Sequence, residues 1–124
     1  MNEAPKLPWT DLVQMSQERH LLAERLYLVS SKPTDGLAPV LANLDPHVAY
    51  QTKLEADGIM FAAGPLASDD LQEWLGEGLF VYRVESMETA QSVAERDPMH
   101  ASGARSFTIR EWLLNEGFSV KLFR

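Results

Sequence analysis

The stretch from residue 47 to residue 65 constrains the fold more than any other part of the chain. It reads HVAYQTKLEADGIMFAAGP. We expect a helix from Pro46 to Asp57, followed by a strand from Ile59 to Ala63. Asp45 suits the N-cap of this helix, the proline after it suits the first helical position, and Gly58 suits the end.

The sequence also indicates which face of this helix and strand is buried. His47, Tyr50 and Leu54 are spaced by three and four positions, so they share one helical stripe, which we expect to face the interior. The strand is too apolar for a sheet with one wet face. Gly64-Pro65 closes the strand, because proline removes a backbone donor from the ladder.

The other patterns predict elements on both sides of this stretch. Before it we expect a loose arm at 1–8, a helix from Thr10 or Asp11 to about Glu24, a strand over 25–31 and a short helix within 37–44. After it we expect a short helix within 66–78 capped by Ser68 or Asp69, and then a strand over 79–86. A helix capped by Ser86 follows, with inward-facing Met87, Ala90, Val93 and Ala94, and then a helical turn that Asp97-Pro98 opens and Gly103 ends. The chain closes with a strand over 104–112, a break at 113–117 and a terminal strand over 118–123.

This order predicts an α+β fold of the ferredoxin-like, split βαβ type. Such a fold has a four-stranded antiparallel sheet with two helices on one face. The first three strands are apolar on both faces, so the second face needs a cover. Either a loop or the N-terminal helix covers it, or a second copy packs sheet against sheet as a dimeric α/β barrel, which we favour. Residues 1–24 form an arm and helix, and residues 25–124 form the domain.

Composition excludes several functional classes. The net charge of −7 argues against nucleic-acid and anionic-membrane partners. The absence of cysteine excludes disulfides, thiol nucleophiles and thiolate-bound metals. We find no phosphate loop, dinucleotide fingerprint or nucleophile elbow, and we expect no cofactor and no metal. The N-terminus has no apolar signal region and no run approaches the ~20 residues of a membrane span, so we expect a cytoplasmic protein.

His47 and Asp97 are the candidate catalytic residues. The first turn of a helix disfavours the imidazolium, which fits a neutral His47 able to accept a proton. Asp97 continues the inward stripe of its helix, three positions after Ala94. It can orient a histidine and stabilise its charged form. The alternatives are a core histidine bonded to a carbonyl, and an aspartate that only caps the turn before Pro98.

Four further residues are candidates for substrate binding. Gly64 and Pro65 can shape a pocket at the strand end, although strand termination alone explains them. Arg83 is predicted in mid-strand, where its charge needs a carboxylate or an anionic ligand, and the alternatives are an ion pair between subunits or a solvated sheet edge. His100 is either a polar group at the pocket rim or an exposed turn residue, and we reject a metal triad with the two catalytic candidates. We expect packing or interface roles for the tryptophans Trp9, Trp74 and Trp112.

From about Arg25 to Glu116 the chain resembles the YciI-like, or YCII-related, domain family. The family pattern has a histidine opening the first helix, "aGP" at the end of the second strand, "DP" at the end of a helix and tryptophan at the end of the last strand. Here it matches His47, Ala63-Gly64-Pro65, Asp97-Pro98 and Trp112. Residues 1–24 and the loop 66–78 depart from the family core.

The resemblance implies a dimeric α/β barrel and a pocket with a His-Asp pair, which falls on His47 and Asp97. The superfamily includes muconolactone isomerases, and the family includes a dehydrochlorinase of a hydroxylated aromatic. We therefore expect a small cofactor-independent isomerase or lyase that acts on a small cyclic or aromatic-derived compound. A non-catalytic module for small-ligand binding or for oligomerisation remains the alternative. The expected partners are a second copy of the chain, in a dimer or higher homo-oligomer, and a small molecule.

Overall fold

The structure, a computed structural model, describes residues 4–117. The predicted terminal strand over 118–123 lies outside these residues. The chain divides into two compact units. One is Leu26–Glu111, and the other contains Met1–Arg25 and Trp112–Arg124, of which 4–25 and 112–117 are described. Among the described residues, no helix is long and apolar enough to cross a membrane.

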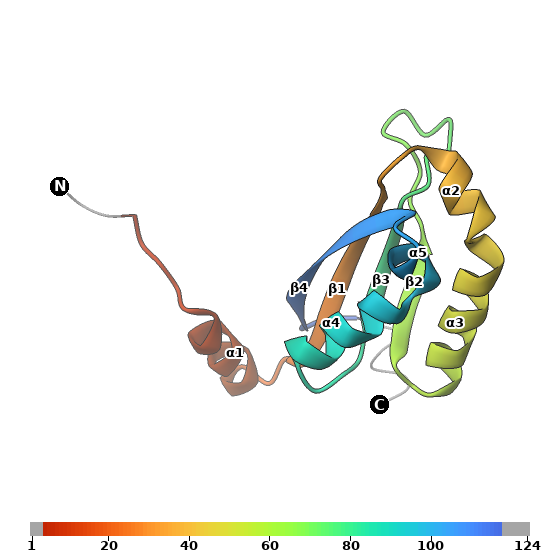
Figure 1. Cartoon of the computed structure of the whole chain (residues 1–124). Helices are drawn as coiled ribbons and strands as arrows, with labels where there is room; N and C mark the ends of the chain where they lie inside the picture. The colour runs from red at the N-terminus through yellow and green to blue at the C-terminus, as the bar shows by residue number, and fades with distance from the viewer. Residues whose placement is uncertain (1–3, 118–124) are drawn as a thin grey trace. The chain divides into compact units, whose positions relative to one another are not determined.

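The secondary structure follows the predicted order (Figure 1). The elements are α1 (Trp9–Glu18), β1 (Glu24–Pro33), α2 (Leu37–Ala42), α3 (Leu44–Ala56), β2 (Met60–Pro65), β3 (Gly78–Tyr82), α4 (Met87–Arg96), α5 (Pro98–Ala101) and β4 (Arg105–Leu114). The strands form one sheet in the order β2-β3-β1-β4, and β3 is antiparallel to both β1 and β2. The prediction of a four-stranded ferredoxin-like α+β fold is confirmed.

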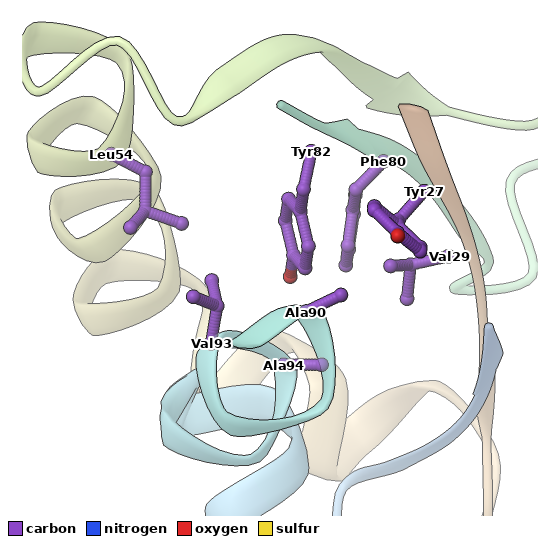
Figure 2. Close-up of a cluster of buried hydrophobic side chains, with 8 residues drawn as sticks. All are labelled: Tyr27, Val29, Leu54, Phe80, Tyr82, Ala90, Val93 and Ala94. Atoms are coloured by element: carbon purple, nitrogen blue, oxygen red, sulfur yellow. The ribbon is translucent and has the colours of Figure 1, made fainter. Parts of the chain in front are cut away.

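The register of the sheet decides which side chains meet the helices. Tyr27 pairs with Tyr82, and Val29 pairs with Phe80. These four side chains lie on one face, and Figure 2 shows them beside Ala90, Val93 and Ala94 of α4. Phe80 is 2% exposed, and full burial of a side chain of this size contributes about 1.5–3 kcal/mol. The main core therefore lies between the sheet and its helices.

The inward stripe of α3 is as predicted. His47 and Leu54 are buried, and Tyr50 is half-buried against the core cluster. The Tyr50 hydroxyl donates to the carbonyl oxygen of Val93 at 2.7 Å, which ties α3 to α4. Gly58 follows the helix with φ +77°, a left-handed conformation that glycine adopts without strain.

The predicted start of α3 is wrong. The helix begins at Leu44, and Asn43 rather than Asp45 occupies the N-cap position, without a side-chain cap bond. Because α2 and α3 adjoin there, Asn43 ends one helix and begins the other, and its side-chain amide donates to the carbonyl oxygen of Pro39 at 2.8 Å. Pro46 is tolerated at the third helical position, because N–H groups of the first turn have no helical acceptor.

The N-terminal helix is shorter than predicted, and Thr10 and Asp11 do not cap it. It begins at Trp9 without a side-chain cap and ends at Glu18, and His20 then adopts φ +60°. Asn115 holds the segment after the helix within the same unit. Its carbonyl oxygen accepts from Leu22 N, and its side chain donates to Ser16 Oγ. These contacts with a distant residue, rather than helical periodicity, set the path of 19–23.

Four more local predictions are corrected. No helix forms within 66–78, because Ser68 and Asp70 hydrogen-bond within a turn instead of capping a helix. The strand β3 ends at Tyr82, so Arg83 is not in mid-strand. Met87 opens α4 and is 41% exposed, not inward-facing. The strand β4 continues to Leu114, so the predicted break begins later.

Candidate active site

His47 and Asp97 are in direct contact. Nδ1 of His47 lies 2.7 Å from Oδ1 and 2.9 Å from Oδ2 of Asp97. His47 is 5% exposed and Asp97 is 0% exposed, so both groups are almost fully removed from water. Helix α3 supplies the imidazole from its first turns, and the junction between α4 and α5 supplies the carboxylate.

The carboxylate of Asp97 also caps α5. Its Oδ1 accepts the backbone N–H of Met99 at 2.9 Å, and Pro98 occupies the first position of that helix. The capping role and the histidine contact, which the sequence presents as alternatives, are thus combined in one side chain. Because the cap fixes the carboxylate, the orientation of the His47 ring is fixed as well.

This contact determines the tautomer of His47. An ionised carboxylate only accepts hydrogen bonds, so Nδ1 carries the hydrogen and donates it to Asp97. The lone pair of the neutral ring then lies on Nε2. Such an imidazole can accept a proton from a bound molecule, and Asp97 stabilises the imidazolium that results.

His47 lines a cavity of about 820 Å³. Helix α3 contributes His47 and Gln51, and the end of β2 contributes Gly64 and Pro65. Leu44 and Val48 of α3 and Ala63 of β2 also line it. The rest of the wall comes from the loop 66–77 and from Gly78, Phe80 and Arg105 of the sheet. The size falls within the range of small-molecule sites.

Gly64 and Pro65 lie on the cavity wall because of the sheet register. Pro65 pairs with Gly78, and Gly64 pairs with Leu79, at the end of the sheet nearest the start of α3. A Cβ atom built on Gly64 would meet no atom within 4 Å. The glycine is therefore not required for packing, and because it is paired with Leu79, a side chain at this position would point away from the sheet face that carries Phe80.

His100 lies behind Phe80 and is not among the residues that line the cavity. Its Nδ1 donates to the carbonyl oxygen of Ala94 at 2.7 Å, so Nε2 accepts from the hydroxyl of Ser31, also at 2.7 Å. Burial lowers the pKa of His100, which favours this neutral form. Phe80 separates the two histidines, with ring centroids 5.4 Å from His47 and 6.2 Å from His100.

Arg83 lies at the other end of β3 from the cavity. Its backbone N–H donates to the carbonyl oxygen of Ile59 at 2.7 Å, and its guanidinium lies 5.3 Å from the ring centre of Phe61. The residues of β3 that line the cavity, Gly78 and Phe80, lie toward the opposite end of the strand. The structure therefore brings His47, Asp97, Gly64 and Pro65 to one site and places Arg83 elsewhere.

Sequence reasoning missed Arg105. This residue is 4% exposed, lines the cavity and donates from Nε to the carbonyl oxygen of Gly76 at 2.7 Å. The sequence did contain a signal for this position. Arg105 alternates with Phe107 and Ile109 along the strand, so it lies on the same face as these residues, which pack against the core. An arginine on the inward face of a strand needs a polar partner.

Trp74 and Gln51 were also missed as cavity residues. Trp74 was expected only to pack, but it lines the cavity, and its indole N–H donates to the carbonyl oxygen of Glu77 at 2.8 Å. Gln51 lies one helical turn after His47 and is half-buried. Within residues 4–117, no group of three histidine or acidic side chains is arranged to hold a metal ion.

Comparisons with known proteins bear on the family and the fold. The chain resembles in structure the 5-chloro-2-hydroxyhydroquinone dehydrochlorinase TftG from Burkholderia phenoliruptrix AC1100, in complex with 2,5-dihydroxybenzoquinone. The TM-score is 0.56 at 18% identity, over 70% of this chain and 92% of the other. No curated protein matches the chain. The YCII-related domain profile matches residues 25–113, so the chain belongs to the YCII-related domain family.

Proposed function

We propose that the protein is a small cytoplasmic, cofactor-independent enzyme of isomerase or lyase type. His47 is its general base and acid, and Asp97 orients the imidazole and stabilises its charged form. Gly64 and Pro65 shape the cavity around the substrate. The single observation that supports this most is the buried contact between His47 Nδ1 and Asp97, at the wall of a cavity of about 820 Å³.

The geometry supports proton transfer in particular. A base needs an accessible lone pair, a fixed orientation and a counter-charge for the protonated form. His47 lines the cavity, Asp97 holds Nδ1, and the carboxylate supplies the counter-charge. Moving a proton between two carbons of a small cyclic compound, or removing one to expel a leaving group, requires no further reactive group from the chain.

The structural neighbour supports the substrate class. That protein is a dehydrochlorinase of a chlorinated hydroxyhydroquinone and binds 2,5-dihydroxybenzoquinone. Because the identity is only 18%, this similarity is evidence for the fold alone, and the substrate of this chain is a proposal. We propose a small cyclic or aromatic-derived compound. The apolar wall that includes Phe80 and Trp74 suits a ring of this size.

A purely structural role for the domain agrees less well with the cavity. An oligomerisation module needs the His47–Asp97 contact for stability but needs no ligand-sized hollow beside it. A non-catalytic ligand-binding module agrees equally well with the cavity, and Gln51 offers a buried side-chain nitrogen without an acceptor among residues 4–117. Chemical change of the bound compound separates this alternative from an enzyme.

The test is a thermal-shift screen with small lactones, hydroxylated aromatics and organic acids. A compound that binds the folded state raises the melting temperature by mass action, whether or not it reacts. Each stabilising compound is then incubated with the wild type and with His47→Ala, and the products are analysed. Turnover by the wild type that His47→Ala lacks supports the proposal. Unchanged turnover by His47→Ala removes the catalytic assignment, and recovery of every ligand unaltered favours the binding module.

We also propose that two copies of the chain pack sheet against sheet as a homodimer. On the sheet face opposite the main core, the register places Leu28 next to Val81, and Leu79 next to Ser30. Leu28 and Leu79 are half-buried. A second copy can complete the burial of this apolar face. Sedimentation velocity tests the assembly, and a monomer at every protein concentration would rule it out.

A further inference from the structure

A buried arginine side chain lines the cavity and has no carboxylate partner among the described residues. Arg105 is 4% exposed, and within residues 4–117 it forms no ion pair. Its Nη1 atom is buried and has no hydrogen-bond partner there. We propose that Arg105 forms an anion-binding subsite, and that the substrate of the proposed enzyme is a small organic acid whose carboxylate binds this guanidinium. The statement that the acid is a substrate rests on the proposed function, but the proposed binding of an acid to Arg105 does not.

Within residues 4–117 the charge of Arg105 is poorly compensated. Burial lowers the pKa of the guanidinium, while the charge of Asp97 acts in the opposite direction. Asp97 is already engaged by His47 Nδ1 and by the Met99 N–H, so it makes no hydrogen bond to Arg105. A buried cation of this kind is stabilised most by an anion that pairs with it directly.

The surrounding backbone is built to hold the guanidinium in place. A Cβ atom on Gly78 would lie 3.2 Å from Nη1 of Arg105 and 2.9 Å from Phe80, so only glycine leaves room there. Gly76, whose carbonyl oxygen accepts from Nε, has φ +103°, and a Cβ on it would lie 2.8 Å from Pro33. Two glycines thus allow the loop 66–77 to close over the arginine.

Aromatic rings cover the sides of the guanidinium. Its carbon lies 6.0 Å from the ring centre of Trp74 and 6.0 Å from that of Phe80. These faces attract a cation but accept no strong hydrogen bond. The rings therefore do not satisfy the N–H groups of Arg105, and Nη1 has no acceptor among residues 4–117.

A second donor that has no acceptor in the described part of the chain lines the same cavity. Nε2 of Gln51 is buried and has no partner within the described part of the chain. Gln51 lies four residues after His47, so both are on the same stripe of α3. Unpaired donors from α3 and β4, beside apolar walls, fit a molecule with an anionic oxygen group on an apolar skeleton.

The alternative is that Arg105 only anchors the loop through Gly76. In that case its replacement lowers stability but does not change which compounds bind. A subsite for a carboxylate instead makes the preference for acids over neutral analogues depend on Arg105. This preference is therefore the quantity to measure.

The experiment compares three acids with amides of the same shape: benzoate, salicylate and cyclohexanecarboxylate, with benzamide, salicylamide and cyclohexanecarboxamide. Isothermal titration calorimetry at low salt gives the affinities for the wild type, Arg105→Met and Arg105→Lys. Lys53→Met is the matched control, because Lys53 is an exposed cation paired with Asp57 and does not line the cavity. Circular dichroism checks that each variant is folded.

The proposal predicts that at least one acid binds the wild type about tenfold or more tightly than its amide. Arg105→Met reduces this ratio to about threefold or less, Arg105→Lys retains part of it, and Lys53→Met leaves it unchanged. If no acid is preferred by the wild type, or if Arg105→Met keeps the full preference, the subsite is overturned. Should Arg105→Met not fold, Arg105→Gln, which keeps a donor for Gly76, replaces it.

Binding and turnover can fail separately. Acid binding that depends on Arg105, without any turnover that depends on His47, keeps the subsite and removes the enzymatic proposal. Turnover that depends on His47, with equal affinity for acids and amides, keeps the enzyme and removes the subsite.

Discussion

Nδ1 of His47 lies 2.7 Å from Oδ1 of Asp97, although the two residues are 50 positions apart in the sequence. The contact joins the start of α3 to the junction of α4 and α5, and the same carboxylate oxygen caps α5. One buried side chain therefore supports both the local fold and the orientation of the proposed base.

The two functions of Asp97 can be separated by two substitutions. Asp97→Asn keeps an oxygen for the Met99 N–H but loses the negative charge, so we expect a folded protein whose turnover is lower by about 100-fold or more. Asp97→Ala removes the cap and leaves a buried N–H of His47 unpaired, so we expect a loss of about 2–4 kcal/mol in the free energy of unfolding. Urea unfolding and steady-state kinetics measure the two effects. Equal turnover in Asp97→Asn and the wild type would contradict the orienting role.

Ala63→Val tests whether the substrate contacts the end of β2, because Ala63 lines the cavity and is paired with Phe80 in the sheet. We expect the larger side chain to weaken ligand binding by about tenfold. Gly64→Ala is the control, because Gly64 is paired with Leu79 and its new methyl group would lie on the other face of the sheet, with no protein atom within 4 Å. We expect Gly64→Ala to leave ligand binding unchanged and the melting temperature unchanged or slightly higher. Thermal unfolding and calorimetry provide the two readouts, and unchanged binding by Ala63→Val would place the ligand away from the end of β2.

The depressed pKa of His100 predicts a pH-dependent term in stability. Its ordinary value is 6.5, and burial lowers it in the folded state, so the unfolded chain binds the proton more readily. Well above pH 6.5 His100 is neutral in both states and this effect costs no stability. As the pH falls through 6.5, the unfolded chain takes up the proton first, and the free energy of unfolding decreases. We expect the melting temperature of His100→Gln, relative to that of the wild type, to rise between pH 7.5 and pH 5. The exposed His20 provides the control substitution, His20→Gln. A constant difference for His100→Gln would contradict the assignment.

The sequence predicted the fold and the two proposed catalytic positions for physical reasons that can be named. The spacing of His47, Tyr50 and Leu54 gives one stripe of a helix, and the register of a split βαβ fold places that helix beside α4. Asp97-Pro98 is a local cap signal, and the cap is present. Each of these features depends on neighbours in the sequence or on the overall topology.

Features set by distant contacts, or by irregular local hydrogen bonds, were not predictable in the same way. Asn43 rather than Asp45 begins α3 because two helices meet there, and Asn115 holds the segment after α1. The loop 66–77 takes its shape from bonds such as Ser68 with Asp70, and from its closure over Arg105. No periodic pattern in the sequence indicates these contacts, so the residues of the loop 66–77 that line the cavity could be identified only from the structure.

The most direct test of the account is whether His47 moves protons on a bound compound. Small lactones and cyclic ketones are incubated in D2O with the protein, and NMR follows the replacement of their acidic C–H hydrogens by deuterium. We predict that at least one compound exchanges about 100-fold or more faster than in buffer alone, and that His47→Gln returns its rate to that of the buffer. Exchange by the wild type that never exceeds the buffer rate, or equal exchange by His47→Gln, would contradict the account.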